Sequence, residues 1–89
     1  VPLLVRWPAR IAPGSSSETP VVLTDLHSTF LELAGRPAAL ETNPDSVSLV
    51  PLLRGTGPLR RNEGIFWHMP QYGTCGDFPG SALRVGDYK

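Results

Sequence analysis

Cysteine and histidine are the side chains in this sequence that could carry nucleophilic, acid–base or metal chemistry. The chain has one cysteine, Cys75, and two histidines, His27 and His68. A reactive cysteine needs a neighbour that stabilises its thiolate, but the nearest ionisable residue to Cys75 is an acid, Asp77. One cysteine and two histidines also match no recognised zinc spacing. We therefore interpret Cys75 as a loop thiol, leaving a pairing with His68 through folding open, and expect no metal site in this chain alone.

His68 lies at the end of a predicted strand, after two aromatic residues and before the turn-rich stretch 70–80. Ligands of α/β folds commonly bind where strands give way to loops, so a histidine there can donate a hydrogen bond to an anion. The alternative is a half-buried histidine whose ring nitrogens are satisfied by backbone carbonyl groups. Spacing alone favours this alternative and leaves the ligand-binding interpretation open.

The basic residues of the chain are seven arginines and one lysine, and eight acids balance them, so the formal net charge is zero. A neutral chain has no long-range field with which to capture nucleic acid or an anionic membrane, and we expect neither as a partner. Arginine recognises carboxylate, phosphate or sulfate groups where two guanidinium groups converge. The sequence does not show convergence, so Arg60 and Arg61 are interpreted as solvated side chains.

The elements that would position these side chains are short, because the 89 residues include 9 glycines and 10 prolines. This length allows one domain at most, with a small core, while 40% hydrophobic residues argue against disorder. A single cysteine cannot form an internal disulfide, and no apolar run approaches the roughly 18 residues of a membrane span. No targeting segment is recognisable, so the compartment stays open.

The first half of the chain predicts one strand and one long helix. Residues 1–7 are nearly continuous in apolar side chains, which is typical of a strand buried on both faces of a sheet. A helix is expected from about residue 25 to residue 34, with Thr24 as its N-cap and Gly35 after its end. Its buried apolar stripe is expected to comprise Leu26, Phe30, Leu33 and Ala34, with His27 and Glu32 in solvent.

The second half predicts a short helix and two strands. The helix spans residues 49–54, capped by Ser48 and closed by Gly55. Strands are expected over residues 65–69 and 81–85, the second entering a Gly86-Asp87 turn. Because the sequence starts at Val1 and stops at that turn, we expect both ends to continue in a longer chain.

Five segments of this sequence, taken in order, resemble landmarks of the arylsulfatase-like sulfatases. Residues 66–72 are similar to that family's Phe-Trp-His-Tyr-Pro-His-Tyr segment, with Met69 and Gln71 as departures. Residues 81–89 are similar to its Ser-Ala-Ile-Arg-x-Gly-Asp-Tyr-Lys hairpin. The other three segments are residues 1–8, 24–35 and 48–55. Each segment alone is weakly specific. Their shared order over nearly the whole chain argues against an accidental similarity.

The resemblance implies an α/β fold: a fragment of an alkaline-phosphatase-like mixed sheet with flanking helices, entering a small C-terminal antiparallel sheet. Residues 1–80 would be the C-terminal portion of the catalytic domain. Residues 81–89 would start the antiparallel subdomain. The strands over residues 1–7 and 65–69 would then belong to the large sheet.

The resemblance also implies hydrolysis of sulfate esters, of carbohydrates or aryl compounds, by a longer enzyme that uses calcium and a formylglycine. The formylglycine forms within a Cys-x-Pro-x-Arg motif, and Cys75 fails this test because Asp77 and Pro79 replace the proline and the arginine. We therefore expect no catalytic residue and no bound cofactor in this fragment. Its one implied substrate-binding residue is His68, near a sulfated sugar or small molecule.

Two alternatives remain beside the sulfatase interpretation. One is a non-catalytic module that binds anions or serves as a scaffold, and the other is a phosphohydrolase of the same superfamily. The resemblance is compatible with a periplasmic, secreted or lysosomal location. It leaves the oligomeric state open.

Overall fold

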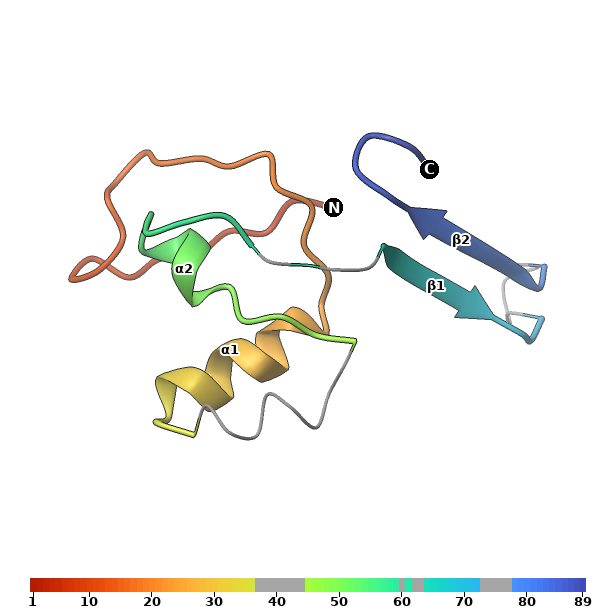
Figure 1. Cartoon of the computed structure of the whole chain (residues 1–89), viewed down its shortest axis with the longest axis horizontal. Coiled ribbons are helices and arrows are strands. Elements are labelled where there is room, and N and C mark those ends of the chain that lie inside the picture. Colours follow the sequence, from red (N-terminus) through yellow and green to blue (C-terminus); the bar gives the residue numbers. More distant parts are fainter. Residues whose placement is uncertain (37–44, 60, 62–63, 73–77) are drawn as a thin grey trace.

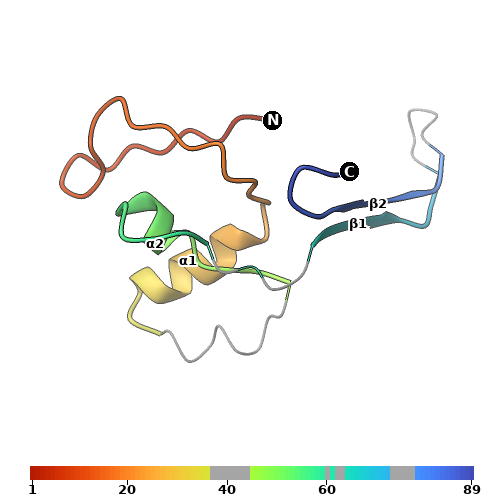
Figure 2. The same ribbon diagram turned by 45° about the horizontal axis from the view of Figure 1, so that its top comes forward.

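A computed structural model describes residues 1–36, 45–59, 61, 64–72 and 78–89 of the chain (Figure 1). The elements in order are α1 (Asp25–Leu33), α2 (Val50–Leu53), β1 (Ile65–Met69) and β2 (Gly80–Arg84). The two helices lie together, whereas the two strands form a hairpin that projects away from them (Figures 1 and 2). The described part of the chain is thus an α/β fragment with two helices and a two-stranded antiparallel sheet.

Helix α1 confirms the predicted helix to within one residue at its C-terminal end. It ends in a Schellman motif, in which the Gly35 N–H donates to the Glu32 carbonyl and the Arg36 N–H donates to the Leu31 carbonyl. Gly35 has a φ of 75°, which a residue without a Cβ adopts at no steric cost. Thr24 occupies the N-cap position, but its side chain makes no capping hydrogen bond there.

The predicted buried face of α1 is wrong. Phe30 and Leu33 are 62% and 41% exposed, whereas Asp25, Ser28 and Thr29 are buried. These three polar residues follow the i, i+3, i+4 spacing of one helix face, and their side chains bond to residues 46–49. Residues 46–48 lie outside any helix or strand, so polar side chains opposite them can satisfy backbone groups that an apolar face would leave unpaired.

Helix α2 lies within the predicted helix of residues 49–54 and is one residue shorter at each end. The Ser48 Oγ accepts a hydrogen bond from the Val50 N–H at 3.2 Å, but the N-cap position belongs to Leu49 rather than to the predicted Ser48. Pro51 sits in the first turn, where its missing N–H breaks no helical bond. Gly55, with a φ of 65°, follows the helix and reverses the chain.

The two strands pair antiparallel, with Ile65 opposite Arg84 and Met69 opposite Gly80. Strand β1 matches its predicted bounds, and β2 lies one residue earlier than predicted. Beyond β2, Val85 and Tyr88 exchange two backbone hydrogen bonds around the Gly86-Asp87 turn, as the sequence predicts. The sequence analysis assigned residues 65–69 and 81–85 to different sheets. In the structure β1 and β2 instead pair in one hairpin.

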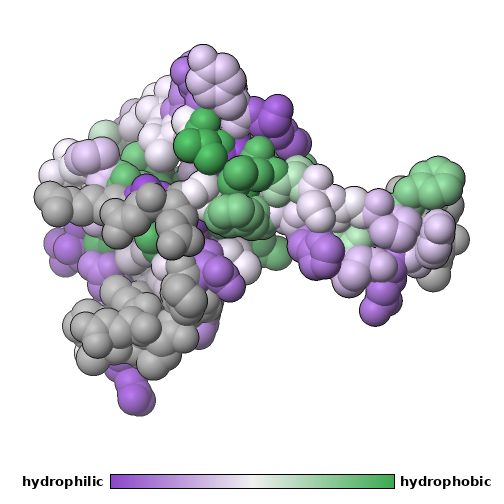
Figure 3. All heavy atoms as spheres, turned by 45° about the vertical axis from the view of Figure 1, so that its right-hand side comes forward, coloured by the Kyte–Doolittle hydropathy of each residue, from purple (hydrophilic) through white to green (hydrophobic). Residues whose placement is uncertain are grey.

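Residues 1–7 form no strand, so this prediction is wrong for the structure. An apolar run predicts burial, but a strand also needs a neighbouring strand to pair its backbone groups. Without one, Val1 and Leu4 are almost fully exposed. Figure 3 shows hydrophobic side chains gathered on the surface between the helical part and the hairpin arm. The buried hydrophobic residues of the described chain are Leu49, Val50 and Ile65.

Candidate functional site

His68 lies in β1, where its cross-strand partner is Ser81 of β2. The His68 Nδ1 and the Ser81 Oγ are 2.8 Å apart, which is hydrogen-bond distance. Both side chains are exposed. The ring nitrogen is thus satisfied by a side chain, rather than by the backbone carbonyl groups that the alternative interpretation expected.

A pocket of about 510 Å³ opens beside this pair at the end of the hairpin. Its lining residues are Trp67, His68, Met69, Phe78, Gly80, Ser81 and Ala82. The Phe78 ring also meets Tyr72 edge-to-face, with 6.1 Å between the ring centroids. An apolar wall with a few polar groups is typical of small-molecule sites, where the polar groups orient the ligand. His68 and Ser81 are the polar side chains that line this pocket besides the Trp67 indole N–H.

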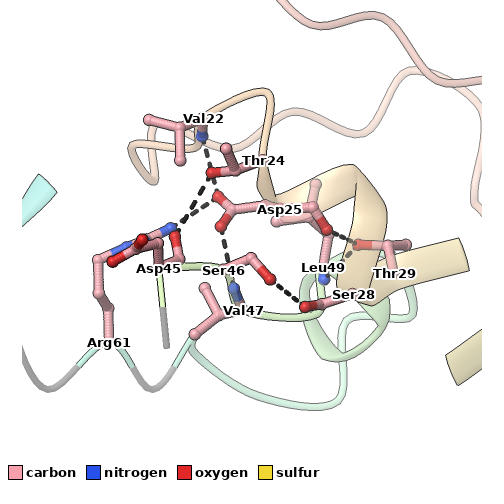
Figure 4. Close-up of polar contacts among 10 residues, drawn as sticks. All are labelled: Val22, Thr24, Asp25, Ser28, Thr29, Asp45, Ser46, Val47, Leu49 and Arg61. Carbon is pink, nitrogen blue, oxygen red and sulfur yellow. Dashed lines mark hydrogen bonds and ion pairs between the residues drawn. The ribbon is translucent and has the colours of Figure 1, made fainter. Parts of the chain in front are cut away.

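A second polar cluster surrounds Asp25 at the start of α1 (Figure 4). The Asp25 carboxylate is fully buried. It accepts hydrogen bonds from the backbone N–H groups of Val22 at 2.9 Å and Val47 at 3.0 Å. It also forms an ion pair of 2.6 Å with Arg61, whose side chain is 18% exposed. The carboxylate is therefore committed to internal partners and is a structural anchor.

Two further contacts join α1 to residues 46–49 (Figure 4). The Thr29 hydroxyl donates to the Asp25 carbonyl at 2.7 Å and accepts from the Leu49 N–H at 2.9 Å. The hydroxyl groups of Ser28 and Ser46 hydrogen-bond to each other. Together with Arg61, these contacts connect segments up to 36 residues apart in the sequence.

The other residues considered in the sequence analysis are not brought to the His68 pocket. His27 is exposed on α1, as the sequence analysis expects, and does not line the pocket beside His68. Arg61 forms an ion pair with the buried Asp25, so the interpretation of Arg61 as a solvated side chain is wrong. Cys75 and Arg60 lie outside the described residues.

Side chains that could bind a metal do not cluster in the part of the chain that the structure describes. That part has no group of three or more acidic, histidine or cysteine side chains close enough to hold a metal ion. The buried carboxylate, Asp25, already accepts from two backbone N–H groups and Arg61. The sequence around Cys75 lacks the formylglycine motif. Within the same described residues, no helix is long and apolar enough to cross a membrane.

Comparison with known proteins defines the class. Residues 1–82 match the family described as "N-sulphoglucosamine sulphohydrolase, C-terminal". The chain therefore belongs to the sulfatases, and within them to this C-terminal family. This confirms the resemblance seen in the sequence.

Individual relatives agree with the family. Over 88 residues the chain is 35% identical to arylsulfatase K of Xenopus laevis and 40% identical to arylsulfatase A of Bos taurus, covering 99% of this chain in each case. It is 36% identical to the steryl-sulfatase of Mus musculus over 81% of this chain. The chain spans only 12 to 16% of the length of these relatives. No solved structure matches the chain significantly.

Sequence reasoning missed two features of these sites. It did not identify Ser81 as the partner of His68, because the long connection between the strands hides their register. It also did not foresee that Arg61 pairs with Asp25. Asp25 in the first turn of α1 indicates the start of a helix, because a negative charge there is favourable. It does not indicate an ion pair with a residue 36 positions later.

Proposed function

We propose that this chain is the C-terminal part of the catalytic domain of a sulfatase that hydrolyses sulfate esters of carbohydrates or aryl compounds. We call that longer protein the parent sulfatase. The observation that carries the proposal is the family match over residues 1–82, supported by relatives named as sulfatases. In the parent sulfatase, this chain contributes substrate recognition rather than the reacting groups.

The proposed architecture is an alkaline-phosphatase-like mixed sheet with flanking helices. Its proposed parts are residues 1–80 and 81–89, and the pairing of β1 with β2 joins them across that boundary. The exposed apolar side chains of residues 1–7 and of α1 support a larger domain, because isolated domains rarely leave so many large apolar groups in water. Within that domain, residues 1–7 would pair with neighbouring strands. Calcium and the formylglycine would be held by residues outside this chain.

His68 is the proposed substrate-binding residue. It lines the hairpin pocket, and its Nδ1 is already bonded to Ser81, so Nε2 is the ring nitrogen left to meet a ligand. A sulfate ester presents only acceptor oxygens, and an imidazole N–H is a suitable donor to them. The Phe78 side chain, which lines the same pocket, would pack against the ring of a sugar or an aryl group.

Replacement of His68 by alanine in the parent sulfatase tests this role. We expect a higher KM for a sulfate ester, by about ten- to 150-fold, because one hydrogen bond to a charged group contributes about 1.5 to 3 kcal/mol. His27→Ala is the matched control, since it removes the other histidine of the chain from α1. Equal KM values for the wild type and His68→Ala would rule out substrate recognition by His68.

A further inference from the structure

The His68–Ser81 pair joins a titratable ring to a hydroxyl group at one register position of the hairpin. The contact runs across the two strands, from Nδ1 to Oγ over 2.8 Å. Among the described residues, no other group hydrogen-bonds to the His68 ring. Ser81 is therefore the partner of this ring within the described part of the chain, and Nε2 is the nitrogen that can meet a ligand.

We propose that Ser81 is a positioning residue that holds His68 with a proton on Nε2, so that the ring donates a hydrogen bond to an anionic oxygen of the substrate. The inference rests on the proposed function for the identity of that anion. Neither the family match nor the relatives assign a role to Ser81. Its basis is the chemistry of the two side chains.

Three proton arrangements are compatible with the observed contact. In the first, the ring is neutral, the Ser81 hydroxyl donates to Nδ1, and the proton is on Nε2. In the second, the ring is a cation, Nδ1–H donates to the Ser81 oxygen, and Nε2 again carries a proton. In the third, the ring is neutral, Nδ1–H donates to Ser81, and Nε2 is an acceptor. An anionic oxygen selects the first two, because the third would place two acceptors against each other.

The hydroxyl group is suited to this role because it can both donate and accept. It can rotate to donate to neutral Nδ1 or accept from protonated Nδ1, so the ring keeps its partner and its orientation in either charge state. Alanine at position 81 provides neither contact, whereas threonine preserves both. The strand positions on which the two residues sit also fix the distance between them. Position 81 thus holds the direction of the ring and supplies the partner that Nδ1 needs in the arrangements that an anion selects.

The tautomer is measured with inorganic sulfate added as the acceptor anion, because the anion selects the arrangements with a proton on Nε2. The parent sulfatase is labelled with ¹⁵N-histidine, and the ring nitrogen shifts of His68 are recorded at about pH 8.5, where imidazole is ordinarily neutral. The His68→Asn variant assigns the signals. We expect the wild type to show a protonated Nε2 and an accepting Nδ1. We expect Ser81→Ala to move both shifts toward a mixture of tautomers, and Ser81→Thr to restore the wild-type values.

Substrate affinity provides the second measurement. Ser81→Ala should raise the KM for a sulfate ester about two- to tenfold with little change in kcat, and Ser81→Thr should recover most of the loss. Ring shifts that are identical in wild type and Ser81→Ala would overturn the positioning role, whatever the enzyme hydrolyses. Altered ring shifts with an unchanged KM in both Ser81→Ala and His68→Ala would instead refute the proposed substrate contact and retain the positioning role.

Discussion

Individual residues in this chain act through close and specific contacts. Gly64 shows this most clearly, because it precedes β1 at the base of the hairpin. A Cβ at this position would lie 2.5 Å from Leu83 Cδ1, 2.7 Å from the Arg84 carbonyl oxygen and 2.9 Å from Val85 Cγ2. The carbonyl oxygen belongs to the backbone of β2 and cannot move aside cheaply. Glycine is therefore required for the strands to approach each other.

We predict that Gly64→Ala destabilises the hairpin by about 1 to 3 kcal/mol, because the added methyl group pushes β2 away from the base of β1. Hydrogen exchange of the β1 and β2 amides in the parent sulfatase would measure the loss. Gly57→Ala is the control, since a Cβ there meets no atom within 4 Å. Equal protection in the two variants would contradict the steric argument.

Thr29 is the second residue whose role can be isolated. Its hydroxyl bridges the Asp25 carbonyl and the Leu49 N–H, and Thr29 and Leu49 are both buried. Thr29→Val keeps the shape but leaves the Leu49 N–H without an acceptor, which should lower the free energy of unfolding by about 1 to 3 kcal/mol. Thr29→Ser retains the hydroxyl and should lose less. Thermal unfolding of the parent sulfatase compares them, and equal losses would show that the bridge contributes nothing.

The elements of the chain show what a sequence can and cannot reveal. The helix and strand bounds follow from local patterns: glycine after each helix, proline after β1 and apolar side chains within the strands. The buried face of α1 does not follow from such patterns. Periodicity groups Phe30 and Leu33 on one face, but the segment against which α1 packs decides which face is buried.

The same limit applies to the candidate site. The position of His68 at a strand end could be predicted from the sequence, since the aromatic run and Pro70 mark the end of β1. Its contact with Ser81 depends on strand register, which the connection between the strands does not reveal. The pairing of Asp25 with Arg61 depends on the tertiary fold. Interactions between distant segments thus account for what the sequence reading missed.

The start of α1 is held to its surroundings by Asp25. We predict that Asp25→Asn destabilises the parent sulfatase by about 3 kcal/mol, because Arg61 then lacks its counter-charge and the amide group places a donor beside other donors. Asp87→Asn makes the same chemical change at an exposed turn and should have little effect. Calorimetric unfolding of the two variants tests this, and similar transition temperatures would exclude Asp25 as an anchor.

At the scale of the whole molecule, the described chain exposes more apolar surface than its small core can balance. Phe66, Tyr72 and Phe78 are 65%, 75% and 79% exposed, as are many apolar residues of the N-terminal segment. Full burial of one large apolar side chain contributes only about 1.5 to 3 kcal/mol, whereas each ordered residue costs about 1 to 2 kcal/mol of backbone entropy. We therefore expect the 89 residues to need further contacts for stability.

We predict that the isolated 89-residue chain folds poorly. Its amide NMR spectrum should show narrow dispersion, and it should bind a hydrophobic dye such as ANS. Narrow dispersion is expected because the buried apolar side chains described here, Leu49, Val50 and Ile65, form too small a core to fix one packing arrangement. A dispersed spectrum with a single cooperative unfolding transition would show that the fragment is an independent domain.

We propose that the parent sulfatase cleaves sulfate esters, and the family match and the relatives' names support this. The most direct test is the ratio of kcat/KM values of the purified parent sulfatase for an aryl sulfate and for the aryl phosphate with the same leaving group. We predict a clearly higher kcat/KM for the sulfate ester, with release of inorganic sulfate. Faster turnover of the phosphate ester, or no turnover of any sulfated aryl or sugar compound, would contradict the claim.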